Sequence, residues 1–315
     1  LTQNPHHPLF PRVHSGTYPS GSTIKPFIAA AALAAGTITP STRIASIGGF
    51  RIGQSVFPDW KAGGHGTVNV RRALAESVNT FFYVIGGGWP SRNEEVGSRN
   101  EEIEPLGPEG IAEALRAFGF GQPTGIDLPD EAGGLVPTPE WKSRVKDAPW
   151  YIGDTYHLAI GQGDLLVTPM QIARATAAIA NGGKLVVPHL EYARREASGV
   201  LQIRAIDPPV ALSADYRSAV RTVREGMRAA VTEGSAAALA NIPMFVAGKT
   251  GTAQHTPGRP PHAWFTGFAE RKTERMVITV LVEEGGEGSR AAVPVAHAML
   301  TWWAAHGTPP AIESV

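Results

Sequence analysis

Apolar residues recur at helical spacing in six stretches of the chain. Residues 168–183 show the pattern most fully, because Thr168 suits an N-cap, Pro169 suits the first turn, and two glycines follow the last apolar position. The same reasoning predicts helices over residues 22–35, 68–87, 108–121, 168–183, 214–232 and 291–307.

Strand-like runs gather late in the chain. A short charged turn joins the last two of them, which predicts a hairpin. The predicted strands cover residues 245–254, 262–270 and 275–285, and residues 44–66 are typical of short strands and turns. Prolines and glycines predict irregular structure for residues 1–20 and 122–155.

The order of these elements indicates the fold class. Helices dominate residues 22–232, with loop insertions, and residues 245–307 hold the strands and a C-terminal helix. Because the strands do not alternate with the helices, we expect an α+β fold with an antiparallel sheet flanked by a helical subdomain. A tandem repeat, SRNEEVG then SRNEEIE, occupies residues 91–104 and is typical of a solvated loop or helix extension.

Composition excludes several classes of function. The 28 basic and 28 acidic residues give zero net charge, so nothing favours nucleic acid as a partner. The chain has no cysteine, which excludes disulfides and thiolate metal sites. No apolar run is long enough for a transmembrane helix.

The stretch YPSGSTIKPF places Ser22 and Lys25 three residues apart at the start of a predicted helix. Positions i and i+3 share one face, so the two side chains point the same way. A serine nucleophile needs an adjacent base, and a lysine can serve when burial and nearby cations lower its pKa. Alone, this pattern is common on surface helices.

Two further short patterns carry polar groups. Ser77 and Asn79 place a hydroxyl and an amide on the same side of a helix or turn. Lys249, Thr250, Gly251 and Thr252 give a strand with a cation and two hydroxyls beside a glycine, against which a substrate carboxylate could lie. Each pattern alone also suits an ordinary helix or edge strand.

Together, Ser-x-x-Lys, Ser-x-Asn and Lys-Thr-Gly in this order form the set found in penicillin-binding proteins and serine β-lactamases. YPSGSTIKP and GKTGTAQ resemble the class B penicillin-binding proteins, the monofunctional transpeptidases. DWKAGGHGTVNVRRALAESVNTFFY and GDTYHLAIGQGDLLVTPMQIARATAAIANGG are most similar to the elongation-type members, penicillin-binding protein 2, with the division type as the next nearest.

The resemblance implies a role for each pattern. Ser22 would be acylated by the D-Ala-D-Ala end of a peptidoglycan stem peptide, with Lys25 as the base. Ser77, linked to Lys25 and Lys249, would pass a proton to the leaving D-Ala, and Asn79 would orient the donor peptide. Lys249 and the residues Thr250, Gly251 and Thr252 would bind the terminal carboxylate, and the backbone N–H groups of Ser22 and Thr252 would form an oxyanion hole.

The resemblance also implies partners and a location. Stem peptides would be the substrates, β-lactam antibiotics would acylate the same serine, and no cofactor is needed. A membrane glycan polymerase of the elongation machinery would bind through regions outside this sequence. The location implied is the bacterial cell envelope, at the outer face of the cytoplasmic membrane, with the anchor outside this sequence.

Two departures from the family pattern give further expectations. Family members carry a membrane anchor, an N-terminal region and a hairpin before the Ser-x-x-Lys helix, whereas 21 residues precede Ser22 here. We therefore expect a transpeptidase domain truncated at its N-terminus, with the 275–285 strand paired on one side only. Some relatives bind zinc near the active site, but here only Asp59 and His65 match such ligands and Val78 replaces the cysteine, so we expect no metal site.

Three functions remain open from the residues alone. One is a peptidoglycan D,D-transpeptidase, the second is a hydrolase such as a β-lactamase or D,D-carboxypeptidase, and the third is a non-catalytic β-lactam sensor. A β-lactamase needs a group that activates the deacylating water, and Glu131 and Glu140 do not lie in a recognisable β-lactamase loop. The features of residues 119–183 favour the transpeptidase.

Overall fold

A computed structural model of the chain describes residue 4 and residues 7–90 and 103–308. Its centre is an antiparallel sheet in the order β11-β10-β9, made of β9 (Phe245–Ala253), β10 (His262–Arg271) and β11 (Glu274–Val282). The predicted hairpin is confirmed, because β10 pairs with β11 from Ala263 opposite Val282 to Arg271 opposite Glu274.

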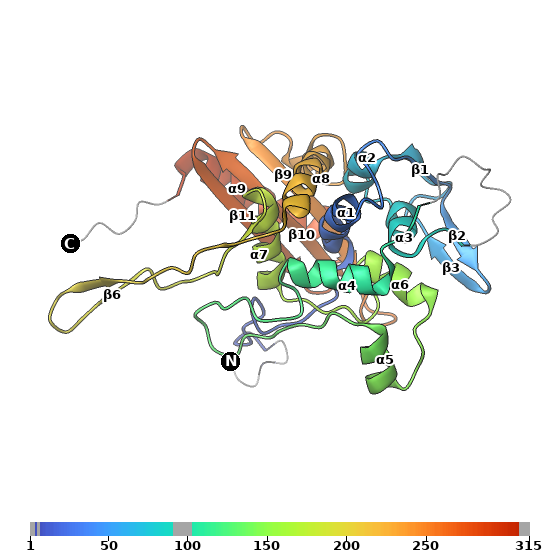
Figure 1. Cartoon of the computed structure of the whole chain (residues 1–315). Helices are drawn as coiled ribbons and strands as arrows, with labels where there is room; N and C mark the ends of the chain where they lie inside the picture. Colours follow the sequence, from blue (N-terminus) through green and yellow to red (C-terminus); the bar gives the residue numbers. More distant parts are fainter. Residues whose placement is uncertain (1–3, 5–6, 91–102, 309–315) are drawn as a thin grey trace.

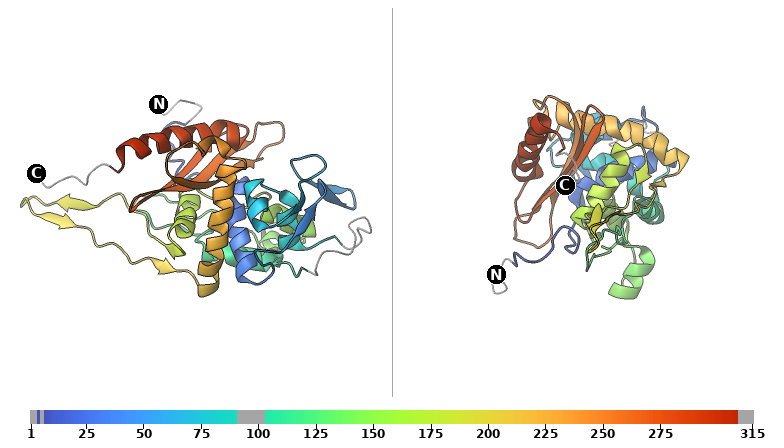
Figure 2. Two further views of the ribbon diagram at one scale, coloured as in Figure 1. Left: turned by 90° about the horizontal axis from the view of Figure 1, so that it is seen from above. Right: turned by 90° about the vertical axis from the view of Figure 1, so that its left-hand side faces the viewer.

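Helices cover both faces of this sheet. Helix α9 (Gly288–His306) packs on one face, and α7 (Pro169–Ala180) and α8 (Ala214–Thr232) pack on the other (Figure 2). Side chains of β10 alternate between two apolar cores, so Phe265 joins the α9 side and Trp264 joins the helical side. The expected α+β class is confirmed.

The outer edge of β11 has no strand partner among the described residues, as expected for the 275–285 strand. A free edge exposes backbone N–H and C=O groups that can pair with another segment. The edge is therefore a place where further strands can be added.

Most predicted helices form where the sequence placed them. Helix α1 (Lys25–Ala34) follows a 3-10 turn, η1 (Gly21–Ile24), and α4 (Gly107–Ala117) covers the 108–121 prediction. Thr168 caps α7 as predicted, since its hydroxyl accepts a hydrogen bond from Gln171 N.

Two predictions of local structure were wrong. The 68–87 helix is two helices, α2 (Val70–Ala75) and α3 (Asn79–Gly87), because Ser77 adopts a left-handed backbone at φ 58°. The 122–155 segment contains α5 (Pro139–Lys146) and the first turn of α6 (Ile152–Ala159), where local caps override the proline and glycine content. The 91–104 repeat lies outside the described residues apart from its last two positions.

Two-stranded ladders occur outside the main sheet, among the helices. Two ladders form an insert before α2: β1 (Ile44–Ser46) with β4 (Gly66–Val68), and β2 (Gly49–Ile52) with β3 (Ser55–Pro58). A short 3-10 turn, η2 (Ala237–Leu239), follows α8.

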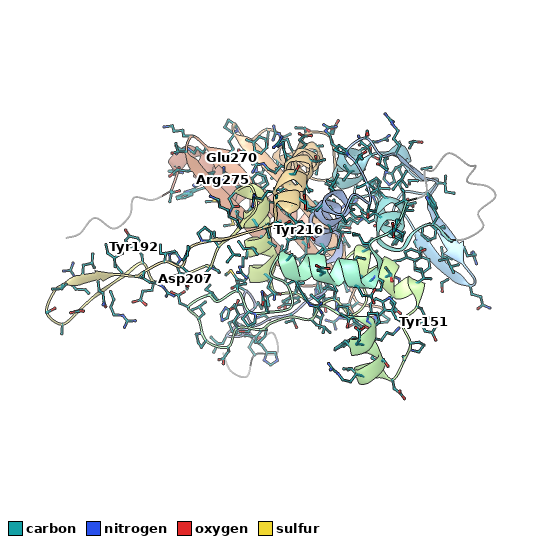
Figure 3. All side chains as sticks on the ribbon, in the orientation of Figure 1. Tyr151, Tyr192, Asp207, Tyr216, Glu270 and Arg275 are labelled. Carbon is teal, nitrogen blue, oxygen red and sulfur yellow. The ribbon has the colours of Figure 1, made fainter. Side chains whose placement is uncertain are left out.

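The segment that connects α7 to α8 in the sequence forms a long arm, which projects from the rest of the molecule (Figure 1). It carries Tyr192 and Asp207 and lies far from α1 and α3 (Figure 3). Its ladders are β5 (Lys184–Leu185) with β8 (Val210–Ala211), and β6 (Ala193–Arg195) with β7 (Leu201–Ile203). In the described parts of the chain, every helix is too short or too polar to cross a bilayer.

Candidate active site

The turn η1 places Ser22 against strand β9. Gly21 has φ 50°, and a Cβ added there would lie 2.6 Å from the carbonyl oxygen of Thr252. The Gly21 N–H donates to Gly161 O at 2.8 Å, which fixes the turn from its other side. Only glycine permits this backbone conformation and this approach together.

Lys25 lies one 3-10 turn after Ser22, and its backbone N–H donates to Ser22 O. Residues three apart are aligned on a 3-10 turn, so the sequence prediction of a shared face holds although the local helix is not α. Pro26 in the first turn suits the start of α1. The Lys25 side chain is fully buried.

Ser77 occupies the break between α2 and α3. The Val78 N–H donates a hydrogen bond to Ala73 O at 3.0 Å. This is the 6→1 hydrogen bond of a Schellman motif, in which Ser77 takes the left-handed position after the helix. Glycine normally fills this position, so no sequence signal marked the break. The turn directs the Ser77 hydroxyl toward two lysines.

Lys25 Nζ donates hydrogen bonds to Ser77 O at 2.9 Å and to Asn79 Oδ1 at 2.6 Å, and it lies 3.4 Å from Ser77 Oγ. Asn79 Nδ2 donates to Pro58 O at 3.0 Å, so both ends of this amide are held. The amide orientation is therefore fixed by Lys25 and the insert.

Lys249 approaches Ser77 from strand β9. Its Nζ donates to Ser77 Oγ at 2.8 Å and to Thr250 O at 2.9 Å, and the side chain is fully buried. Ser77 thus links Lys25 to Lys249 in one continuous chain of hydrogen bonds, although Lys25 and Lys249 are 224 positions apart in the sequence.

Gly251 and Thr252, which continue the Lys-Thr-Gly stretch of β9, lie beside the η1 region. A Cβ at Gly251 would lie 2.9 Å from Thr23 Cγ2 and 3.1 Å from Ser20 O, so the absence of a side chain lets the η1 region pack on β9. Thr252 is exposed beside it. Hydrogen bonds thus join the side chains of Lys25, Ser77, Asn79 and Lys249, and the η1 turn that carries Ser22 packs on the strand that carries Thr250, Gly251 and Thr252.

One expected contact is absent from the described residues: no hydrogen bond joins Ser22 Oγ to Lys25 Nζ. Lys25 instead donates to Ser77 and Asn79. Contacts between a nucleophile and its base are often long without a ligand and tighten only when substrate binds.

Sequence reasoning missed two groups at this site. Ser235, after α8, shares a hydrogen bond with Thr250 Oγ1 at 2.6 Å. The Gly288 N–H, in the first turn of α9, donates to Thr252 Oγ1 at 3.4 Å, which leaves the Thr252 hydroxyl proton free for a ligand. Neither residue carries a local signal, because only the tertiary fold brings it to β9.

The two lysines have perturbed acidities. Burial, followed by the neighbouring Lys249 ammonium, holds the pKa of Lys25 well below its ordinary value, against an opposing effect of Asp59. Burial lowers the pKa of Lys249 to about 7. A neutral lysine amine can accept a proton, so the site holds candidates for a nucleophile, a base and a hydroxyl relay.

The lowered pKa of Lys249 predicts a pH-dependent stability. Unfolding restores the ordinary pKa of 10.5, so between pH ~7 and ~10.5 the unfolded chain binds one more proton than the folded chain. The free energy of unfolding should therefore rise with pH by about 1.4 kcal/mol per pH unit from this group.

Urea unfolding at pH ~7 and ~9 measures this rise, and Lys249→Met should reduce it while the exposed-site variant Lys184→Met should not. An equal pH dependence in wild type and Lys249→Met would contradict the assignment.

Asp59, His65 and Val78 do not fit a zinc site. Both Asp59 oxygens accept hydrogen bonds, from Ser46 Oγ at 2.6 Å and from Thr80 N at 3.0 Å. His65 Nδ1 lies 2.6 Å from Glu76 Oε2, and its buried Nε2 has no partner. No group of three or more potential metal ligands occurs within the described ranges. The absence of metal stays a prediction.

Known proteins have sequences similar to this chain. A family profile described as "Penicillin binding protein transpeptidase domain" matches residues 2–301. The Haemophilus influenzae protein named peptidoglycan D,D-transpeptidase MrdA is 35% identical over 317 residues, which cover 94% of this chain and 46% of that protein. The chain thus spans about half the length of this curated relative.

Solved structures are similar throughout the chain. Penicillin-binding protein 2 of Helicobacter pylori, in a complex with MreC, superposes with a TM-score of 0.82 at 32% identity, covering 98% of this chain and 53% of that one. Penicillin-binding protein A of Mycobacterium tuberculosis, as an imipenem acyl-enzyme, gives 0.76 at 27% identity, covering 97% and 63%.

Proposed function

The chain belongs to the penicillin-binding protein transpeptidase domain family, and from this premise we propose that it catalyses D,D-transpeptidation of peptidoglycan stem peptides through an acyl-enzyme on Ser22. The single observation that carries the proposal is that the half-buried Ser77 hydroxyl lies between two fully buried lysines, Lys25 and Lys249, beside the turn that holds Ser22.

The reaction follows from the groups present. Ser22 Oγ attacks the carbonyl carbon of the penultimate D-Ala, and neutral Lys25 accepts the hydroxyl proton. The Ser77 hydroxyl, between the two lysines, relays a proton to the nitrogen of the leaving D-Ala as the peptide bond breaks. An amine of a second stem peptide then attacks the ester, releases Ser22 and forms the cross-link.

Substrate binding uses the strand. The substrate carboxylate would lie along Lys249, Thr250 and Thr252, where Gly288 N–H leaves the Thr252 hydroxyl free to donate. Asn79, held at both ends of its amide, would bind the donor peptide backbone. The N–H groups of Ser22 and Thr252 would stabilise the oxyanion.

A hydrolase is less well supported. Deacylation by water needs a base on the open face of the ester, and the two candidate glutamates are placed elsewhere. Glu131 accepts hydrogen bonds from Thr124 N at 2.8 Å and from Gly125 N at 2.9 Å, so it closes a turn. Glu140 lies exposed in the first turn of α5.

Intact-protein mass spectrometry over time after mixing with benzylpenicillin tests this function. We expect about one adduct per chain, mapped by peptide analysis to Ser22 and persisting for many minutes, because neither Glu131 nor Glu140 is placed to activate a deacylating water. Steady turnover of excess penicillin without an adduct would assign the chain to the β-lactamases. No adduct in a folded sample would contradict the transpeptidase proposal.

The relatives suggest where this activity is used. We propose that the chain acts on peptidoglycan in the bacterial cell envelope, on the outer side of the cytoplasmic membrane, within an elongation-type machinery. The Helicobacter pylori relative is found in a complex with MreC. We propose that this chain has two kinds of partner: a protein similar to MreC and a membrane glycan polymerase.

A further inference from the structure

Ser77 holds an unfavourable backbone conformation. Its φ of 58° puts a residue with a Cβ at the left-handed position that ends α2. Such a conformation is unfavourable for a residue other than glycine, because the Cβ comes too close to the following carbonyl oxygen. Because Ser77 Oγ lies 2.8 Å from Lys249 Nζ, the turn and the hydroxyl position are coupled, and contacts from outside the turn must offset that cost.

Glu76, the residue before it, is held from three sides. Its carboxylate oxygens contact Arg72 Nε at 2.5 Å and His65 Nδ1 at 2.6 Å. Its backbone carbonyl accepts a hydrogen bond from Trp60 Nε1 at 2.8 Å. This carbonyl belongs to the peptide unit that joins Glu76 to Ser77, so the indole N–H sets the orientation of that unit.

The two contacting rings come from one segment of the insert. Trp60 and His65 lie between β3 and β4 and pack edge-to-face, with ring centroids 5.2 Å apart. The His65 side chain is fully buried, whereas Trp60 is 67% exposed. An indole this exposed contributes little by burial, so its ordered donor to Glu76 is its most specific contact.

We propose that Trp60 and Glu76 are positioning residues that keep the Ser77 hydroxyl between Lys25 and Lys249. The proposal rests on the proposed function for its kinetic readout. His65 and Arg72 hold the Glu76 carboxylate, Trp60 holds the Glu76 carbonyl, and Lys25 Nζ holds the Ser77 carbonyl at 2.9 Å. Two successive peptide units are therefore fixed on either side of the strained residue.

A purely structural role would have a different kinetic signature. Loss of stability alone lowers the amount of folded protein and leaves the acylation chemistry of the folded fraction unchanged. Displacement of Ser77 Oγ instead slows the chemical step, while the carboxylate site on β9 keeps its affinity. The rate constant of acylation and the preceding dissociation constant thus separate the two roles.

The variants are Trp60→Phe, which removes the N–H and keeps an aromatic ring, and Glu76→Gln, which removes the charge at nearly constant size. Their matched controls are Trp302→Phe and Glu225→Gln. Trp302 is 53% exposed on α9, and neither Trp302 Nε1 nor the Glu225 carboxylate makes a hydrogen bond within the described part of the chain.

Stopped-flow labelling with a fluorescent penicillin yields both constants. We expect each test variant to lower the acylation rate constant by about 10- to 100-fold, the scale of a misplacement near 1 Å, with the dissociation constant unchanged within about twofold. Both controls should match wild type. Rate constants of both test variants within about twofold of wild type would overturn the proposal.

A crystal structure of Trp60→Phe provides a readout that needs no acylation. We expect Ser77 to leave its left-handed conformation or its Oγ to lose contact with Lys249. A slowed variant in which Ser77 is unmoved would mean that Trp60 acts on the ligand directly, which overturns the positioning role. If wild type is not acylated, the proposed function fails, and this structure alone decides the inference.

Discussion

Lys25→Met is expected to lower the rate constant for acylation of Ser22 by benzylpenicillin by about 10²- to 10⁴-fold, the range for loss of a general base. Lys25 is the buried amine nearest in sequence to Ser22, and its pKa is held well below the ordinary value by burial and by Lys249. Methionine fills similar space but supplies no proton acceptor and no donor to Ser77 O and Asn79 Oδ1.

Rapid-quench mass spectrometry of the adduct measures the rate, with Ser22→Ala as the floor at which no labelling occurs. Lys184→Met, at an exposed position on β5, is the control for a lost lysine charge. Because Ser77 O and Asn79 Oδ1 lose their donor, thermal unfolding of Lys25→Met must show that the protein is folded.

The pH profile gives a second check on the same variant. In wild type, acylation should slow as pH falls through the lowered pKa of Lys25, because the protonated amine cannot accept a proton. That limb should disappear in Lys25→Met. A variant that acylates as fast as wild type, or that keeps the same limb, would move the role of base to another group such as Lys249.

The sequence was sufficient to predict the family because the three short patterns are contiguous and their order is specific. The Ser22–Lys25 spacing, the Ser77 hydroxyl and the Lys249 strand are each readable from a few letters. The late strands were readable for the same local reason, since β-branched and aromatic runs with a charged turn predict a hairpin.

What could not be predicted depends on contacts between distant segments. The α2–α3 break lies at Ser77, where helical periodicity continues and no glycine marks the end, and the left-handed turn is held by Lys25, Lys249 and Trp60. Ser235 and Gly288 have no pattern of their own and gain a role only because α8 and α9 pack against β9.

The same reasoning gives the second large effect, at Gly21. Gly21→Ala is expected to lower the acylation rate constant by about 10²-fold and to destabilise the fold by about 2–4 kcal/mol. The new Cβ would lie 2.6 Å from Thr252 O and 2.9 Å from Thr252 C, and neither backbone atom can rotate away. Turn η1 must therefore shift from β9, which separates Ser22 from the Thr252 N–H.

Gly36→Ala separates this effect from backbone strain. Gly36 has φ 75° after α1, and an added Cβ meets nothing within 4 Å, so that variant carries the left-handed cost of about 1–2 kcal/mol without a clash. Urea unfolding and the penicillin rate constant are compared for both variants. Gly36→Ala should acylate like wild type; equal rates in the two variants would mean that the close approach of η1 to β9 is not what positions Ser22.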